Sequence, residues 1–231
     1  MSMLKKKRLS VGLFIILFCC TGSLLAQKSE IGAGLGTFNY TGDLVRTYNF
    51  AYSRPAVTVM YRSNLSKVVS FRASITGGQL SGSDKRPIDA FAQQRNVSFD
   101  IFLMEAATTL EYHFLNWRDD KFMVRFSPYV FGGLGLFSIA GNDTKPAEYS
   151  NIQLALPLGM GVKYILNPKW YMALEFGIRK TSFDYLDNVS DENTGQKNYQ
   201  YGNPFDNDNY FFLGISLTRT FYDIPCPTNP Y

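Results

Sequence analysis

The sequence has 231 residues, a length that suits one domain, including a single all-β domain of generous size. Hydrophobic residues make up 45% of the chain, but the mean hydropathy is only −0.12, which excludes a protein built mainly of membrane-spanning helices. The formal net charge of +4 does not indicate nucleic-acid binding, because four basic residues near the N-terminus account for it.

The first 26 residues have the layout of a secretory signal peptide. Basic residues at 5–8 precede an apolar run at 11–20, and the sequence SLLAQ then offers a cleavage site after Ala26. The apolar run is too short to span a bilayer well. Cys19 and Cys20 also suggest a lipoprotein signal, but neither follows the small residues that such a site requires. We therefore expect export and cleavage, which lower Lys+Arg from 23 to 19 against 19 acidic residues.

Eight segments of the mature sequence alternate apolar residues with small, polar or charged ones, which predicts β-strands. In the stretch IQLALPLGMGVKYIL, every even-numbered residue from Ile152 to Leu166 is large and apolar. No amphipathic helix of useful length accompanies these segments, so no second layer is expected to cover a sheet. In chain order the segments lie at 30–38, 56–63, 68–76, 103–114, 122–137, 152–166, 170–178 and 210–221.

The connections between these segments alternate between long and short. The long ones are at 41–54, 80–97, 141–150 and 182–209, and the short ones are at 64–67, 116–120 and 167–169. This alternation is typical of an outer-membrane barrel with short periplasmic turns and long external loops. The predicted fold class is therefore all-β, an eight-stranded antiparallel up-and-down transmembrane β-barrel preceded by a signal peptide.

The domain organisation follows from this assignment. We expect a signal peptide at 1–26, the transmembrane barrel at 27–221 and a periplasmic C-terminal tail at 222–231. An even number of strands places both ends of the barrel on the short-turn side, so both termini are expected in the periplasm and the barrel in the bacterial outer membrane.

The apolar side of each predicted strand is expected to face lipid. A soluble barrel would turn its apolar side inward, and it would not gather outward aromatic residues near one rim. Here they gather close to the short turns or the C-terminal end of the barrel, as in the girdle that marks a membrane interface. The predicted girdle consists of Tyr61, Phe71, Tyr112, Phe114, Phe122, Tyr164, Trp170 and Phe221.

The opposite, polar side of the strands is expected to line the lumen. An eight-stranded barrel leaves room inside only for side chains, and isolated charges there would be costly, so paired networks are expected. Inward glycines would make space for the long side chains, whereas Pro128 and Pro157 each remove a ladder hydrogen bond and predict a bulge near one or both. The predicted lumen network consists of Arg62, Arg72, Glu105, Glu111, Arg125, Lys163, Glu175 and Arg179.

The sequence predicts no enzyme, no cofactor and no metal site. His113 is the only histidine, and it lies three residues before a short turn, at the rim opposite to the one that membrane-barrel hydrolases and acyltransferases use. We expect it to form hydrogen bonds in the lumen. Glu105 and Glu111 are six residues apart on one strand, which is roughly 20 Å and too far for a general acid–base pair.

Two further patterns have ordinary explanations. The glycine-rich stretches GAGLG and FGGLG lack both the spacing of a phosphate-binding loop and a following helix. The acidic residues of the loop at 182–209 could bind calcium, but the spacing of a hand-type loop is missing, so a solvated surface loop is favoured.

The C-terminal tail contains the one cysteine that the mature chain would keep. Cys226 cannot form an intrachain disulfide, and it is either an incidental free thiol or a link to a periplasmic partner. The prolines on either side favour an extended tail. Cys226 and its neighbours Asp223 and Pro225 are the candidate partner contacts.

Several blocks of the mature sequence resemble the PorG-type, DUF6089-like outer-membrane barrels of Bacteroidota. They include YTGDL, RPAVTVMYRSNLS, SFDIFLMEAATTLEYHFL, FSPYVFGGLGLF and FGIRKTSFDYLDNVS, and together they cover nearly the whole mature chain. The resemblance implies an eight-stranded component of the type IX protein secretion system. In that family the barrel is a membrane anchor for a periplasmic ring lipoprotein and its associated proteins. The family has no catalytic residues that could be assigned to positions of this sequence.

Two functions from different classes therefore remain. The first is a non-catalytic anchor or scaffold of the secretion machinery, which would act through the periplasmic turns and tail. The second is a structural or adhesive surface barrel, which would act through the loops at 80–97 and 182–209. A small lipid-modifying enzyme is disfavoured, because no His/Ser/Asp set is expected at the outer rim.

Overall fold

The computed structural model describes residues 29–42, 44–45, 48–83, 98–115, 124–140, 150–181, 186 and 208–221. The expected signal peptide and the tail with Asp223, Pro225 and Cys226 lie outside the described residues, as do Phe122 and most of the long loops.

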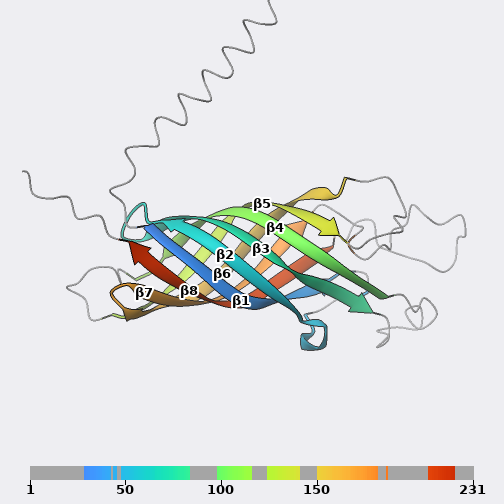
Figure 1. Ribbon diagram of the computed structural model, residues 1–231, viewed down its shortest axis with the longest axis horizontal. Helices are drawn as coiled ribbons and strands as arrows, with labels where there is room; N and C mark the ends of the chain where they lie inside the picture. Colours follow the sequence, from blue (N-terminus) through green and yellow to red (C-terminus); the bar gives the residue numbers. More distant parts are fainter. Residues whose placement is uncertain are drawn as a thin grey trace, which may run out of the picture.

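Eight antiparallel strands form one closed barrel in which each strand pairs with its sequence neighbours and β1 pairs with β8 (Figure 1). This confirms the predicted fold class. A single turn of 3₁₀-helix, η2 (Phe50–Tyr52), lies between the first two strands. The strands are β1 (Ser29–Thr41), β2 (Arg54–Ser63), β3 (Val69–Ser83), β4 (Ser98–His113), β5 (Phe126–Ala140), β6 (Ile152–Asn167), β7 (Trp170–Thr181) and β8 (Asn209–Phe221).

The short connections lie at the same end of the barrel as the start of β1 and the end of β8. Ser29 pairs with Ser63, just before the β2–β3 turn, and also with Phe221, the last residue of β8. Trp170, directly after the β6–β7 turn, pairs with Arg219. We call this end the short-turn end and the opposite one the long-loop end.

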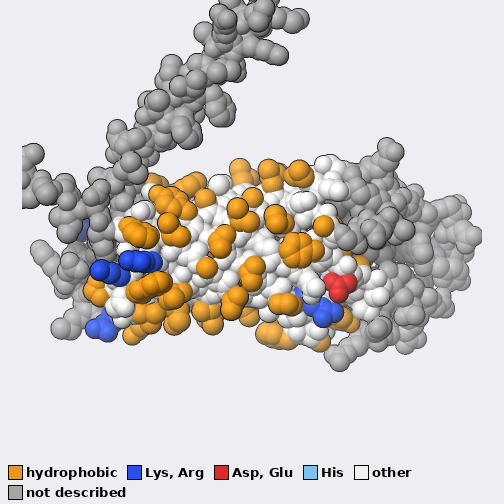
Figure 2. Space-filling view, viewed as in Figure 1, with side chains coloured by type: hydrophobic (Ala, Val, Ile, Leu, Met, Phe, Trp, Pro, Cys, Tyr) orange, Lys and Arg blue, Asp and Glu red, His pale blue; other side chains and the backbone are white. Residues whose placement is uncertain are grey.

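Outward side chains form an apolar wall between the two ends (Figure 2). The period of two along each strand places large hydrophobic residues on this surface, where many are half exposed. The wall includes Ile31, Leu35, Val57, Val59, Ile75, Met104, Leu110, Leu134, Leu136, Leu154, Leu158, Met160, Leu174, Ile215 and Leu217.

Inward side chains divide the lumen into two halves of different character. Near the short-turn end they are charged and polar, as predicted. Near the long-loop end they are apolar, which corrects the expectation of a uniformly polar inward face. This apolar core contains Phe38, Tyr40, Leu80, Phe99, Ile101, Leu103, Phe137, Ile139, Tyr210 and Phe212.

Part of the apolar half was missed because several strands extend further than their sequence patterns indicate. β3 continues to Ser83 and β4 begins at Ser98, so part of the expected loop at 80–97 belongs to strands. These added lengths bring Leu80, Phe99 and Ile101 into the barrel. There the three side chains belong to the apolar core and are shielded from water.

The two prolines do not introduce the predicted bulge. Pro128 pairs with Val162, and the β5–β6 register is the same on both sides of Pro157, because Gly132 pairs with Leu158 and Gly135 with Ala155. The register shift that does occur lies between Ile165 and Asn167, beside the β6–β7 turn. The β5–β6 ladder lacks pairs at Gly133 and Leu134, opposite Pro157 and Leu156, but the register does not shift there.

Close approach of β1 to β8 requires glycine at position 34. A Cβ on Gly34 would lie 2.7 Å from the carbonyl oxygen of Ile215 and 2.9 Å from Cβ of Ser216, and neither atom can move without moving the strand. Gly77 faces outward by contrast, and a Cβ there would approach nothing nearer than 3.4 Å, at the ring of Phe102.

We expect Gly34→Ala to destabilise the barrel by about 1–3 kcal/mol, because the added methyl overpacks backbone against backbone. The matched control Gly77→Ala should change stability by about 1 kcal/mol or less. Urea titration of each variant in vesicles, followed by tryptophan fluorescence, gives both values. Equal effects at the two positions would contradict the proposed crowding.

Candidate functional site

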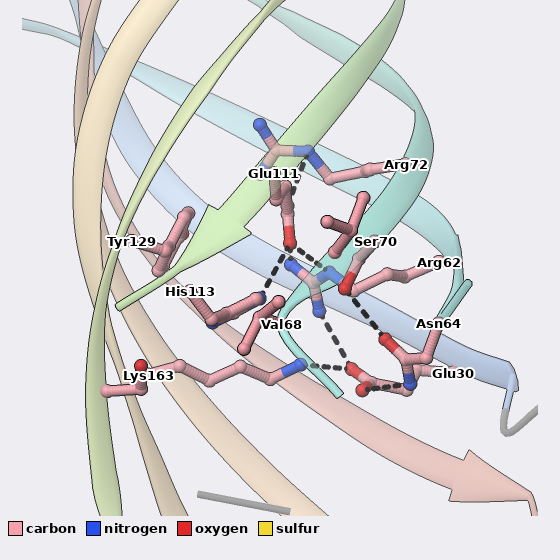
Figure 3. A network of polar contacts seen from close by, with 12 residues as sticks. Glu30, Arg62, Asn64, Val68, Ser70, Arg72, Glu111, His113, Tyr129 and Lys163 are labelled. Atoms are coloured by element: carbon pink, nitrogen blue, oxygen red, sulfur yellow. Dashed lines mark hydrogen bonds and ion pairs between the residues drawn. The ribbon is translucent and has the colours of Figure 1, made fainter. Parts of the chain in front are cut away.

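A cluster of ion pairs fills the lumen near the short-turn end (Figure 3). One carboxylate oxygen of Glu30, on β1, accepts from Arg62 Nη1 at 2.8 Å and from Lys163 Nζ at 2.5 Å. The other oxygen accepts from Asn64 Nδ2 at 2.9 Å. Strands β1, β2 and β6 are thereby joined across the lumen.

A second carboxylate, Glu111 of β4, lies between two arginines. Arg62 Nη2 donates to Glu111 Oε1 at 3.0 Å, and Arg62 Nε lies 2.7 Å from Oε2, so the guanidinium is close to both carboxylate oxygens. Arg72 Nε of β3 lies 3.2 Å from Oε1 and also donates to the Thr109 hydroxyl at 3.1 Å.

The network continues towards the long-loop end through Arg72. This arginine pairs with Glu175 of β7, which also accepts from the Tyr129 hydroxyl at 3.1 Å. Arg179 Nη2 lies 3.8 Å from Glu175, and its Nε donates to Glu105 Oε2 at 3.3 Å. One chain of contacts therefore runs from the short-turn end to the apolar half of the lumen.

The charges in this chain of contacts cancel. Arg62, Arg72, Lys163 and Arg179 lie among Glu30, Glu105, Glu111 and Glu175, all with side chains that are less than a tenth exposed. Buried charges are tolerated when each has a partner and further hydrogen bonds, which is the arrangement here.

The packing of the lumen leaves little free space within the described residues. A cavity of about 10 Å³ lies beside Arg72, Glu175 and Arg179, with Met60 and Phe212 also in its lining. Such a volume holds about one water molecule. The described part of the lumen is therefore a packed core and not a passage.

The structure places seven of the eight predicted lumen residues in this network and excludes one. Arg125 is exposed, because β5 begins only at Phe126 and residue 125 lies beyond the rim of the barrel. Sequence reasoning also missed Glu30, although it shares the even-numbered parity of the inward glycines of β1 and could have been found by that signal.

His113 lies in the same cluster and is fully buried. Its Nε2 is 3.5 Å from Glu111 Oε2, and its ring lies against that of Tyr129 with centroids 5.1 Å apart. The ring therefore lies inside the lumen, as expected. Among the described residues, no three or more His, Cys, Asp and Glu side chains group closely enough to hold a metal ion.

The described members of the predicted girdle lie on the outer wall near the short-turn end. Phe71 is half-buried, and six are exposed: Tyr61, Tyr112, Phe114, Tyr164, Trp170 and Phe221. Tyr112 and Phe114 contact each other edge to face, with ring centroids 5.4 Å apart. Phe126 is a further outward aromatic, and it pairs with Tyr164. In the described part of the chain, no helix is long and apolar enough to cross a bilayer.

A closed eight-stranded barrel with an apolar exterior and a charge-filled interior defines the class of this protein, the barrel of outer-membrane type. The chain belongs to the family described as "Domain of unknown function (DUF6089)", whose model matches residues 7–229. This match confirms the DUF6089-like part of the resemblance seen in the sequence. No curated protein matches the chain.

Comparison with solved structures finds similarity to outer-membrane proteins. Neisserial surface protein A has a TM-score of 0.53 and 12% sequence identity, with 84% of this chain and 97% of that chain covered. The attachment invasion locus protein Ail of Yersinia pestis gives 0.46 and 12%, covering 84% and 99%. Outer Membrane Protein W of E. coli gives 0.44 and 13%, covering 85% and 98%. At sequence identities this low, structural similarity is evidence about the fold alone and not about function.

Loss of one carboxylate from the network should be costly. We expect Glu111→Gln to destabilise the barrel by about 3 kcal/mol or more, because Arg62 and Arg72 would each keep a buried charge with one counter-ion fewer. The free energy of unfolding in vesicles provides the measurement.

Two further variants serve as controls. Asp100→Asn, at an exposed carboxylate, should change stability by about 0.5 kcal/mol or less. Combining Glu111→Gln with Arg62→Met restores charge balance, because Lys163 still neutralises Glu30, and should recover part of the loss. An unchanged free energy of unfolding in Glu111→Gln would contradict the assigned role of the network.

Proposed function

We propose that the protein is an integral outer-membrane barrel that is exported by cleavage of residues 1–26 and has both termini in the periplasm. The apolar wall carries this proposal, because an exposed apolar surface that encircles a barrel needs a non-aqueous cover. On β6, outward apolar residues extend from Ile152 to Leu166. At a strand tilt of about 40° this stretch rises roughly 35 Å, which is enough to cross an apolar band about 25 Å tall.

Within that membrane, we propose a non-catalytic role as anchor or scaffold for the periplasmic ring complex of the type IX secretion system. The sequence blocks that resemble PorG-type barrels support the link to secretion, and the DUF6089 match is consistent with it. The packed lumen supports a scaffold over a conduit, because a cavity of about 10 Å³ admits no secreted polypeptide. The partner would be the ring lipoprotein and its associated proteins, with membrane lipid around the barrel.

The C-terminal tail is the segment that we propose as the contact with the ring. Asp223, Pro225 and Cys226 follow β8 in the sequence, and β8 ends at the short-turn end of the barrel. This placement makes them available to a periplasmic protein if the short-turn end faces the periplasm. A covalent link through Cys226 is one form of the contact.

Removal of residues 222–231 should abolish co-purification of the ring lipoprotein with the barrel from native membranes. Cys226→Ser should remove any higher-mass band seen on non-reducing gels and leave the barrel itself folded. The migration difference between heated and unheated samples on gels controls for folding. Undiminished co-purification after trimming would contradict the tail as the contact.

The second candidate is a structural or adhesive surface barrel, and one observation favours it. Residues of the long loops, Leu44, Val45 and Leu186, are buried in the apolar core at the long-loop end. Asp208 accepts from the Tyr40 hydroxyl at 2.6 Å and from the backbone N–H of Leu186 at 2.9 Å. These contacts tie parts of two loops to the barrel, which suits an ordered binding surface. Unchanged ring association in the trimmed strain would favour this candidate.

A further inference from the structure

We propose that exposed cations at the short-turn end bind the headgroups of anionic phospholipids. The cations are Lys67, Arg125, Lys169 and Arg219, and all four side chains are exposed. One lies in the β2–β3 turn, one directly before β5, one in the β6–β7 turn and one near the end of β8. They form a cationic rim, and the inference rests on the proposed location of the barrel in a membrane.

Arg219 fixes the depth of this rim. It faces outward on β8, pairs with Trp170 and Ile31, and places its guanidinium 5.4 Å from the centroid of the Phe221 ring. A charge on the lipid-facing wall is costly at the bilayer midplane and nearly free at the interface. Arg219 therefore lies at the headgroup level, together with the aromatic girdle.

Main-chain hydrogen bonds hold two of the cations, Lys169 and Arg125, at this level. The Thr220 N–H donates to the Lys169 carbonyl at 2.8 Å, and the Ile165 N–H donates to the Arg125 carbonyl at 2.7 Å. The Asn167 side chain accepts from the N–H groups of Lys169 and Trp170 at 3.0 and 2.9 Å, which fixes the turn between β6 and β7. The rim is thus a defined feature of the barrel end.

The described carboxylates at this end point inward. Glu30 and Glu111 lie near it, and both are buried in contact with the lumen cations. Within the described residues, the only exposed carboxylate is Asp100, which lies at the long-loop end together with Arg54 and Lys180. The outward charge of the described short-turn end is therefore positive, as Figure 2 shows at the end of the barrel where β8 finishes.

The neighbours of the cations favour lipid as the occupant over an acidic protein. Arg219 lies between the outward aromatic residues Trp170 and Phe221, on the side wall that faces the bilayer. Lys169 directly precedes Trp170, and Arg125 directly precedes the outward Phe126. Cations interleaved with interfacial aromatics complement a negatively charged headgroup whose acyl chains lie along the apolar wall.

Fluorescence quenching by brominated lipids tests the proposal at Trp170, which is next to both Lys169 and Arg219. The sequence has two tryptophans, so Trp117→Phe leaves Trp170 as the only reporter. The mature chain is reconstituted in phosphatidylcholine vesicles that contain either brominated phosphatidylglycerol or brominated phosphatidylcholine at equal mole fraction. Both lipids carry a phosphate, so the comparison isolates the net negative charge of the headgroup.

We expect brominated phosphatidylglycerol to bind near Trp170 about five-fold or more tightly, since each cation near an anionic surface contributes a factor of about five. Arg219→Gln combined with Lys169→Gln should reduce the ratio to about one, whereas Arg219→Lys with Lys169→Arg should retain it. The matched control Arg54→Gln with Lys180→Gln, at the long-loop end, should leave the ratio unchanged.

Two other outcomes would distinguish an error in the headgroup site from an error in the membrane location. Equal quenching by the two lipids in the parent, or a preference that survives loss of Arg219 and Lys169, would overturn the headgroup site while leaving the membrane location intact. Absence of quenching by either lipid, in a barrel shown to be folded by its gel migration, would contradict the membrane location itself.

Discussion

Pairing of the arginine, lysine and glutamate side chains that the structure describes in the lumen is the constraint on which the rest of the fold depends. The lumen is too narrow for bulk water, so a charged side chain there must find its partner on another strand. Glu30 joins β1 to β2 and β6, and Glu111 joins β4 to β2 and β3. Two of these contacts, from β1 to β6 and from β4 to β2, join strands that are not neighbours in the sheet, so they constrain the cross-section of the barrel as well as its neutrality.

The exterior follows from the same geometry. Because side chains alternate along a strand, filling the lumen with charged residues assigns the remaining positions to the outer wall, and there they are apolar. The two ends then differ. The short-turn end has a polar interior and an exterior of aromatic residues and cations, whereas the long-loop end has an apolar interior to which Leu44, Val45 and Leu186 contribute. This polarity suits a protein that meets different partners on the two sides of a membrane.

Much of this structure could be predicted from the sequence, because a strict period of two decides the direction of each side chain. The parity of residues 152–166 and 170–178 alone places Lys163, Glu175 and Arg179 inside. Parity fails where strand ends are uncertain. Arg125 has inward parity but lies before the start of β5. Leu80 lies in a strand extension that the sequence assigned to a loop, and Phe99 in one that the sequence assigned to no strand. The particular ion pairs depend on barrel closure and on the stagger between strands, which periodicity does not specify.

The account depends most directly on lipid contact of the outer wall, and a pair of substitutions at two depths tests it. Leu174, half exposed in the middle of β7, and Leu166, similarly exposed beside the β6–β7 turn, both face outward. The free energy of unfolding in vesicles should fall by about 2–4 kcal/mol for Leu174→Arg and by about 1 kcal/mol or less for Leu166→Arg, because the penalty for arginine depends on depth. Losses below about 0.5 kcal/mol at both positions, as for ordinary exposed sites in water, would contradict the account.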